Sequence, residues 1–278
     1  MFCNLPANRL VFLLPNNMNL KIAILSPGGN DTALVEPFVV NKRLKKIIND
    51  KIMKMFPNVE QVGFVDSKKL RIEMAGGEFC GNALRSAAYY FLKGKPGKLE
   101  IQASGVKNRL SAGVKSSSVA WAKMPVYKSK KKLQKIGRFT IVQLKGITHV
   151  VTDLQKIPDN KEELKIYGKS ILDKLGLSVK YPASGVMFIK RTAKRLSLYP
   201  VVWVRDIETL FYETACASGS AAVGIARWTK FCKENFETKI IQPSGKEIKV
   251  DIKAKRDAID QVTISGPIET VLSKTINL

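Results

Sequence analysis

The 278-residue chain has little cysteine, a single histidine and no long apolar segment. No window holds 18 consecutive apolar residues, so we expect no membrane-spanning helix. Its four cysteines are neither dense nor spaced as a C-x-x-C metal site. We therefore expect neither a disulfide framework nor a metal centre. We expect a cytoplasmic protein with reduced thiols. The sequence also lacks a zinc finger, a DNA-recognition helix and an aromatic RNA-binding platform.

Acidic residues are scarce relative to basic ones, with 23 Asp and Glu against 47 Lys and Arg, a net charge of +24. A charge of this size could steer anions or hold nucleic acid. The densest cluster lies at 127–138, where lysines fill most of 128–135. Most other lysines are scattered, as in 42–54, where they form the polar face of an amphipathic helix. We therefore expect a solvated surface, and a nucleic-acid partner is disfavoured.

The stretch 73–92, EMAGGEFCGNALRSAAYYFL, places a cysteine at the start of a helix. A short strand at 70–72 precedes it, and apolar residues recur after Cys80 at helical spacing, at positions 84, 87, 88, 91 and 92. Unpaired N–H groups and the helix dipole favour negative charge at such a position, which predicts a lowered thiol pKa and a docking point for an anion. A buried structural cysteine is the alternative.

The stretch 211–227, FYETACASGSAAVGIAR, repeats this arrangement around Cys216. A strand at 200–204 comes before it, and the following segment is rich in alanine, glycine and isoleucine on every side. A helix that is apolar all round is a buried helix. Aligning Cys216 with Cys80 places Ala217 and Ser218 opposite Gly81 and Asn82.

The rest of the chain also recurs, which predicts an internal duplication. The paired features are an opening strand (21–25 and 139–144), a second strand (32–35 and 148–152), a helix (42–56 and 161–175), a third strand (61–65 and 185–189), the cysteine with its helix, and a closing I-Q-x-S-G (101–105 and 241–245). We expect an N-terminal extension at 1–17, a first half at 18–126 and a second half at 127–278, whose last strand could pair with the first half.

The expected fold class is α+β. Each half is expected to be an antiparallel, barrel-like sheet wrapped around its central helix, with the helix N-terminus at the rim. Two such halves related by a pseudo-twofold axis would bring the rims together. Cys80 and Cys216 would then face each other across a cleft.

The motifs EFCGNAxR and ETACxSG resemble those of the diaminopimelate epimerase family of cofactor-independent racemases. The resemblance extends over nearly the whole chain from Met18. Its further motifs are PGGN at 27–30, QPSG at 242–245 and SGP at 265–267. Within the family, QVGFVDS at 61–67 and MAGGEFCGNA at 74–83 are most similar to the histidine racemases of opine-metallophore pathways. The resemblance implies a diaminopimelate epimerase-like fold and a small-molecule amino-acid substrate, with histidine favoured and no cofactor.

Carried over by position, the resemblance assigns Cys80 and Cys216 as the acid/base pair. It assigns the substrate-binding role to Asn30, Gly81, Asn82, His149, Glu213, Ala217 and Ser218. Removal of an α-proton needs a base, stabilisation of the carbanion and, for racemisation, a proton donor on the opposite face of the same carbon. Two cysteines on two helix N-termini meet these needs. Asn30 as a turn residue, His149 as an ordinary strand residue and Glu213 as a helix cap are the alternatives.

The sequence departs from diaminopimelate epimerases at three places. Met74 and Ile147 replace asparagines, and 206–210 lacks the Glu-Arg pair expected upstream of the second cysteine. These changes put diaminopimelate itself in doubt as the substrate. A diaminopimelate epimerase and a catalytically dead basic binding protein using the lysine cluster remain the alternatives. Proline-racemase chemistry is disfavoured because Gly-Asn rather than Gly-His follows Cys80, and the phenazine-biosynthesis branch usually lacks paired cysteines.

The sequence assigns no role to Cys3 or Cys232. A homodimer, a start of translation at Met18 rather than Met1, and a partner for the lysine cluster are left open.

Overall fold

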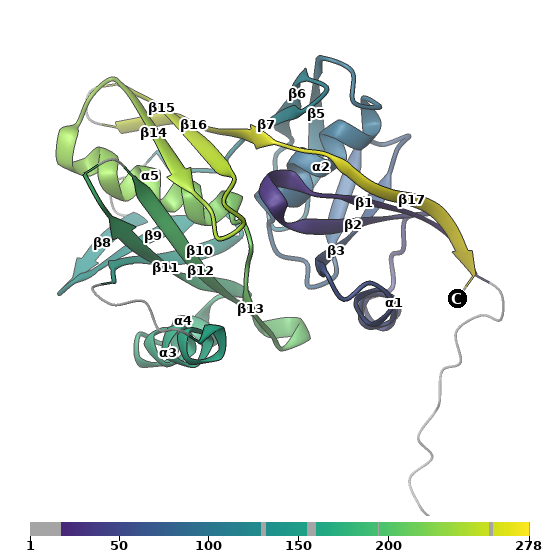
Figure 1. The fold of residues 1–278 in the computed structure, drawn as a ribbon, viewed down its shortest axis with the longest axis horizontal. Helices are drawn as coiled ribbons and strands as arrows, with labels where there is room; N and C mark the ends of the chain where they lie inside the picture. Colours follow the sequence, from purple (N-terminus) through teal and green to yellow (C-terminus); the bar gives the residue numbers. More distant parts are fainter. Residues whose placement is uncertain (1–17, 129–131, 155–159, 194, 256–257, 278) are drawn as a thin grey trace, which may run out of the picture.

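The computed structural model describes residues 18–128, 132–154, 160–193, 195–255 and 258–277. The expected N-terminal extension, with Cys3, and positions 129–131 of the lysine cluster lie outside the described residues. The described chain forms two lobes side by side, and its C-terminal strand runs back from the second lobe along the first (Figure 1). The described part contains five α-helices and seventeen strands, a mixed α+β architecture.

The first lobe is built around helix α2 (Gly81–Phe91), whose residues 81–88 are all buried. Small and apolar side chains such as Ala87 and Ala88 let strands approach the helix closely. The strands of this lobe are β1 (Asn19–Leu25), β2 (Asp31–Glu36), β3 (Val59–Asp66), β4 (Arg71–Met74), β5 (Gly97–Ala103), β6 (Leu110–Ser116) and β7 (Val119–Lys123). Helix α1 (Lys42–Met55) covers the outer side, where Ile48 and Ile52 are fully buried.

The second lobe is built around helix α5 (Ala217–Phe231), which is buried continuously from Ala217 to Ala226. Its strands are β8 (Leu133–Ile136), β9 (Phe139–Leu144), β10 (Ile147–Asp153), β11 (Ala183–Arg191), β12 (Leu196–Val204), β13 (Thr209–Tyr212), β14 (Asn235–Ile241), β15 (Glu247–Lys255) and β16 (Ala258–Pro267). Helices α3 (Lys161–Lys174) and α4 (Leu177–Lys180) pack on its outer side through Leu164, Leu172 and Leu177.

Two strand pairings join the lobes. Strand β16 pairs antiparallel with β7 of the first lobe, and β17 (Thr270–Asn277) pairs antiparallel with β1. One hydrophobic cluster includes residues of both α2 and α5 together with strands of both lobes. The two central helices therefore share a continuous core, which fixes how their ends meet.

The sequence predicted both central helices and the outer helices at 42–56 and 161–175 within a residue or two. The expectation that each half is an antiparallel, barrel-like sheet was wrong in part. Strand β2 pairs parallel with β3, and β10 pairs parallel with β11. The reason is that α1 and α3 are crossover connections, which return the chain in its original direction and produce a parallel pair.

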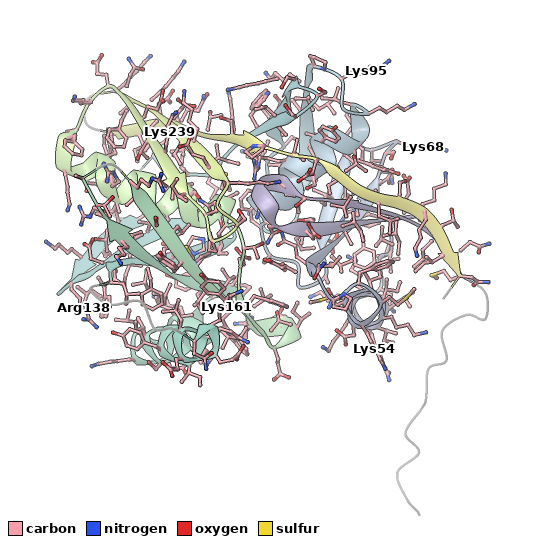
Figure 2. All side chains as sticks on the ribbon, viewed as in Figure 1. Lys54, Lys68, Lys95, Arg138, Lys161 and Lys239 are labelled. Atoms are coloured by element: carbon pink, nitrogen blue, oxygen red, sulfur yellow. The ribbon has the colours of Figure 1, made fainter. Side chains whose placement is uncertain are left out.

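Basic side chains are distributed over both lobes. Figure 2 shows Lys54, Lys68 and Lys95 on the first lobe, and Arg138, Lys161 and Lys239 on the second. Among the described residues, no helix has the length and apolar character needed to cross a membrane.

Candidate active site

Each predicted cysteine caps one of the two central helices. Cys80 is the N-cap of α2 and Cys216 the N-cap of α5, both with extended backbone. The Cys80 sulfur accepts a hydrogen bond from the Ala83 N–H at 3.4 Å, and the Cys216 sulfur accepts one from the Gly219 N–H at 3.2 Å. Thiols thus occupy positions that hydroxyl or carboxylate side chains usually take. Both sulfur atoms lie where helix N–H groups and dipoles favour negative charge.

The N-termini of the two helices are in direct contact. A Cβ atom built on Gly81 would lie 2.9 Å from the Cβ of Ala217, closer than real Cβ atoms approach a neighbour. The Asn82 side-chain amide donates to the carbonyl of Ala215 at 2.7 Å, which ties the first helix to the loop before the second cysteine. Glycine at position 81 is what allows this approach. The predicted convergence of the two helix ends is therefore present in the structure.

Further hydrogen bonds hold the loop before Cys216 against the first lobe. The Thr214 hydroxyl donates to the carbonyl of Gly29 at 2.7 Å, and the Thr214 N–H donates to the Glu60 carboxylate at 3.0 Å. The Cys216 N–H donates to the side-chain oxygen of Gln242 at 3.0 Å. Polar groups from both lobes thus fix the position of the second cysteine.

A pocket between the lobes is lined by both cysteines and by the first residues of both helices. Its other polar lining includes Glu60, Gln61, Glu78, Thr209 and Glu213. Its apolar lining includes Met74, Ile147, Val202, Val204, Ile207 and Phe211. Its free volume is about 40 Å³, room for a few water molecules rather than for an amino acid. For an amino acid to enter the pocket, the lobes or the lining side chains must move apart.

The Cys80 thiol belongs to an amide network of the first lobe. Its sulfur donates to the side-chain oxygen of Gln61 at 3.0 Å. The Gln61 amide in turn donates to Asn30 at 2.6 Å and to Thr32 at 2.9 Å. Asn30 also donates to the Glu60 carboxylate. Cys80, which is only partly buried, is therefore oriented by neutral groups.

The Cys216 thiol has different surroundings. Its sulfur lies 3.6 Å from the Ser218 hydroxyl, which is 2.9 Å from His149 Nε2. Burial lowers the pKa of His149 to about 3, so the imidazole is neutral at physiological pH. Cys216 itself is 3% exposed. A neutral histidine behind Ser218 therefore fixes the hydroxyl next to the sulfur without adding charge.

Three carboxyl groups lie around the cysteines, of which Glu78 is buried and Glu60 and Glu213 are partly buried. Burial raises the pKa of Glu60 to about 7, although hydrogen bonds from Thr214 and Asn30 act in the opposite direction. Burial likewise raises the pKa of Glu78 to about 7. Burial and then the charge of Glu60 raise the pKa of Glu213 to about 8. These groups can change protonation near neutral pH, which is typical of catalytic sites.

The thiols do not have the lowered pKa that was predicted from their helix positions. Burial, followed by the negative charge of Glu213, raises the pKa of both Cys80 and Cys216. The backbone N–H groups lower it, as expected, but by less. The prediction considered the helix dipole and left out the larger effect of burial and, for Cys80, the charge of Glu213, which tertiary packing brings near it. At neutral pH both cysteines are therefore thiols.

A buried arginine lies beneath the first cysteine. Arg85, the last residue of the EFCGNAxR motif, is fully buried and donates to the Asn82 side-chain oxygen at 3.0 Å. Burial lowers its pKa to about 10, so it remains a cation at neutral pH, and the nearby Cys80 favours that charge. Arg85 therefore holds Asn82 in the position that contacts the second lobe.

Most of the predicted site residues line the pocket, namely Cys80, Gly81, Asn82, Glu213, Cys216, Ala217 and Ser218. Asn30 and His149 lie one layer behind it, fully buried, where they hold Gln61 and Ser218. Sequence reasoning did not assign Glu60, Gln61, Glu78, Thr209 or Phe211. Adjacent polar residues at 60 and 61 in an otherwise apolar strand were a signal for the first two. Among the described residues, no group of three His, Cys, Asp or Glu side chains could hold a metal ion.

Known proteins are similar to this chain in sequence and in fold. A family model described as the histidine racemase CntK N-terminal domain matches residues 19–276. A histidine racemase of Fusobacterium nucleatum subsp. nucleatum is 30% identical over 276 residues, covering 91% of this chain and 97% of that protein.

Two solved structures show the fold alone, since each is only 12% identical to this chain. A hydroxyproline epimerase from Agrobacterium vitis with bound trans-4-hydroxy-L-proline has a TM-score of 0.62 and covers 94% of this chain and 91% of its own. A phenazine biosynthesis PhzF family protein from Enterococcus faecalis has a TM-score of 0.57 and covers 94% and 100%. The two protein classes that the cysteine motifs disfavoured as activities thus share the architecture.

Proposed function

We propose that this chain racemises free histidine. It belongs to the family of the histidine racemase CntK N-terminal domain. It is therefore an isomerase of the racemase and epimerase class. In this proposal Cys80 and Cys216 are the two acid/base groups and no cofactor takes part. The observation that supports it most is the contact between two helix N-termini, each capped by a cysteine, at one pocket.

The helix starts provide the site for the substrate carboxylate. Gly81 and Asn82 begin α2, and Ala217 and Ser218 begin α5. The first N–H groups of a helix have no acceptor within the helix and favour an anion. Negative charge grows on the carboxylate as the α-proton leaves, so these groups stabilise the transition state more than the ground state.

The two sulfurs act on opposite faces of the α-carbon. One cysteine, as thiolate, removes the α-proton and becomes a thiol. The other, as thiol, donates its proton to the opposite face and becomes a thiolate. The reverse reaction exchanges the two roles, so one proton is lost and one gained in each turnover. The pair titrates as a coupled unit.

Substrate binding provides the thiolate. Burial, and then the negative charge of Glu213, raise the pKa of both thiols. The α-ammonium of an amino acid is a cation that can pair with Glu213 or Glu60, which offsets this charge. An opposite charge within a few ångströms favours the ionised thiol. Loss of the thiol proton to water is thus coupled to the arrival of substrate.

The pocket lining favours histidine over diaminopimelate. Met74 and Ile147, which replace asparagines of diaminopimelate epimerases, both line the pocket. The distal ammonium and carboxylate of diaminopimelate would lose water against such apolar groups without gaining partners, at a large cost in free energy.

We further propose that the halves are related by duplication, in a diaminopimelate epimerase-like arrangement. Strands β1, β2 and β3 pair antiparallel and then parallel, and strands β9, β10 and β11 do the same. A helix lies between the second and third strand of each set, and a cysteine-capped helix follows later in each half.

The test is proton exchange at Cα in heavy water, followed by NMR for L-histidine, LL-diaminopimelate and the common L-amino acids. We expect exchange and formation of the D-enantiomer with histidine and none with diaminopimelate. Exchange of diaminopimelate alone would make the protein a diaminopimelate epimerase. Absence of any exchange, together with tight and steeply salt-dependent nucleic-acid binding, would instead support a basic binding protein on an inactive scaffold.

A further inference from the structure

The pocket contains two buried polar atoms that have no partner among the described residues, and they come from different lobes. Glu78 precedes α2 in the first lobe, and its Oε2 accepts no hydrogen bond. Thr209 begins β13 in the second lobe, and its hydroxyl has no partner either. Both residues line the pocket. A buried polar group without a partner is costly and calls for an explanation.

The two groups lie at the same end of the pocket. A Cβ atom built on Gly76 would be 2.6 Å from Glu78 Oε2 and 2.7 Å from Val204 Cγ1, so carboxylate and valine meet at that glycine. Val204 is the direct partner of Thr209 in the antiparallel pair of β12 and β13. Side chains that are directly opposite in such a pair lie on the same face of the sheet. Thr209 is therefore a neighbour of the place where Glu78 meets the second lobe.

The other two acidic groups of the pocket already have partners. Glu60 accepts hydrogen bonds from Thr214 and Asn30. The carboxyl group of Glu213 is hydrogen-bonded to the Cys216 thiol. Burial raises the pKa of the Glu78 carboxyl and the backbone N–H groups of Gly76 and Glu78 lower it, and its Oε2 is buried without a hydrogen-bond partner among the described residues. Glu78 is thus the carboxylate most available to a substrate side chain.

The chemistry of this end selects a particular kind of side chain. Its surroundings are apolar or aromatic, with Val204, Ile207 and Phe211 among the lining residues. A carboxylate can accept one hydrogen bond and a hydroxyl can donate one. A neutral imidazole ring has one N–H donor and one nitrogen acceptor on a flat, largely apolar body. An ammonium group would bring more donors than acceptors are present, and a carboxylate would be repelled by Glu78.

We propose that Glu78 and Thr209 are specificity-determining residues that bind the two ring nitrogens of the substrate, with Glu78 accepting from the N–H and Thr209 donating to the other nitrogen. This assignment rests on the proposed histidine racemase function.

The experiment compares two substrates in two variants and one control. The substrates are L-histidine and L-β-(2-thienyl)alanine, which has a five-membered ring of similar size without nitrogen. The variants are Glu78→Gln and Thr209→Val, both nearly isosteric, and the matched control is Glu163→Gln on the exposed start of α3. The quantity measured is the ratio of kcat/KM for Cα exchange with histidine to that with thienylalanine.

We expect Glu78→Gln to lower this ratio about 5- to 10-fold, because the amide oxygen still accepts from the ring N–H but without the charge that strengthens the hydrogen bond. Thr209→Val should lower it about 3- to 10-fold, as for a neutral hydrogen bond. Glu163→Gln should leave it unchanged. A general loss of packing would reduce both substrates alike and leave the ratio constant. The thermal midpoint of each variant checks that it is folded.

A ratio within about threefold of the original in a folded Glu78→Gln variant overturns the proposal while leaving the racemase function intact. If the unmodified protein exchanges some other amino acid and not histidine, the proposed substrate fails and this inference fails with it. The two failures are thus distinguished by the behaviour of the unmodified protein.

Discussion

The two cysteine caps have nearly the same backbone and very different surroundings. Each sulfur accepts the N–H of the residue three positions on, and each follows an extended backbone. Cys80 is partly buried and bound to the amide of Gln61. Cys216 is almost completely buried beside Glu213 and the Ser218 hydroxyl. The helix end gives each sulfur the same backbone N–H donor, and the neighbouring side chains give the two sulfurs different surroundings.

The difference follows from the shape of an amino acid. Of two bases on opposite faces of one α-carbon, each faces the α-hydrogen of one enantiomer, and their surroundings differ because the ammonium and the side chain cannot be placed symmetrically. Two equivalent helix starts can bind the substrate carboxylate together. The carboxylate that pairs with the substrate ammonium can lie on one side only. A duplicated scaffold with unequal linings is therefore the expected solution for racemisation in our account.

The largest predicted effect comes from removing either sulfur. Cys80→Ser and Cys216→Ser should each lower kcat for histidine racemisation about 10²- to 10⁴-fold, the usual contribution of a general acid or base. An alcohol is a much weaker acid than a thiol, so neither serine can replace its cysteine. Cys232→Ser, which changes the exposed thiol at the end of α5, is the control. Turnover in Cys80→Ser or Cys216→Ser as high as in Cys232→Ser would contradict the acid/base role of that cysteine.

The contact between the helix starts should be sensitive to single methyl groups. Gly81→Ala would place a Cβ 2.9 Å from that of Ala217 and should lower stability by about 1–3 kcal/mol, the usual cost of overpacking. Activity should fall with it, because the caps move apart.

The double variant with Ala217→Gly removes the opposing methyl and should recover much of both losses. Thermal unfolding and turnover measured on the two single variants and the double variant give the coupling directly. Simple additivity of the two changes would show that the helix starts do not meet.

The environments of the caps can be compared through thiol reactivity. The negative charge of Glu213 raises the pKa of both cysteines, so Glu213→Gln should lower both pKa values and speed alkylation by iodoacetamide at pH 8. The effect should be larger at Cys216, which is also hydrogen-bonded to Glu213. Peptide mass spectrometry after timed alkylation measures each cysteine separately. Slower alkylation in the variant would be the opposite of what this arrangement requires.

A smaller effect is expected on stability against pH. Glu60, Glu78 and Glu213 have folded pKa values raised to about 7, 7 and 8. Their contribution is complete below the unfolded value and is lost as pH rises through these values. His149, with its pKa lowered to about 3, acts only below about pH 6.5. The thermal midpoint should therefore fall by a few degrees between pH 6.5 and 8.5, and by less in Glu213→Gln.

The sequence predicted the structure correctly where a local pattern of residues determines an element. Helical spacing after Cys80 and the all-apolar segment after Cys216 predicted both central helices, and the repeat predicted that their ends belong together. Glu78 and Thr209 could not be found this way. They are distant in sequence, and only the approach of Val204, the strand partner of Thr209, to the loop before α2 brings them near each other. The raised thiol pKa values were missed for the same reason, because Glu213 acts on Cys80 through space.

The most direct test of the central claim is the fate of the α-hydrogen during early turnover of L-histidine in heavy water. If two sulfurs act on opposite faces, each D-histidine formed takes its hydrogen from the second cysteine, so the product carries deuterium while the remaining L-histidine keeps its protium. D-histidine that retains the original protium would mean that one group serves both faces, and the account of two opposed cysteines would then be wrong.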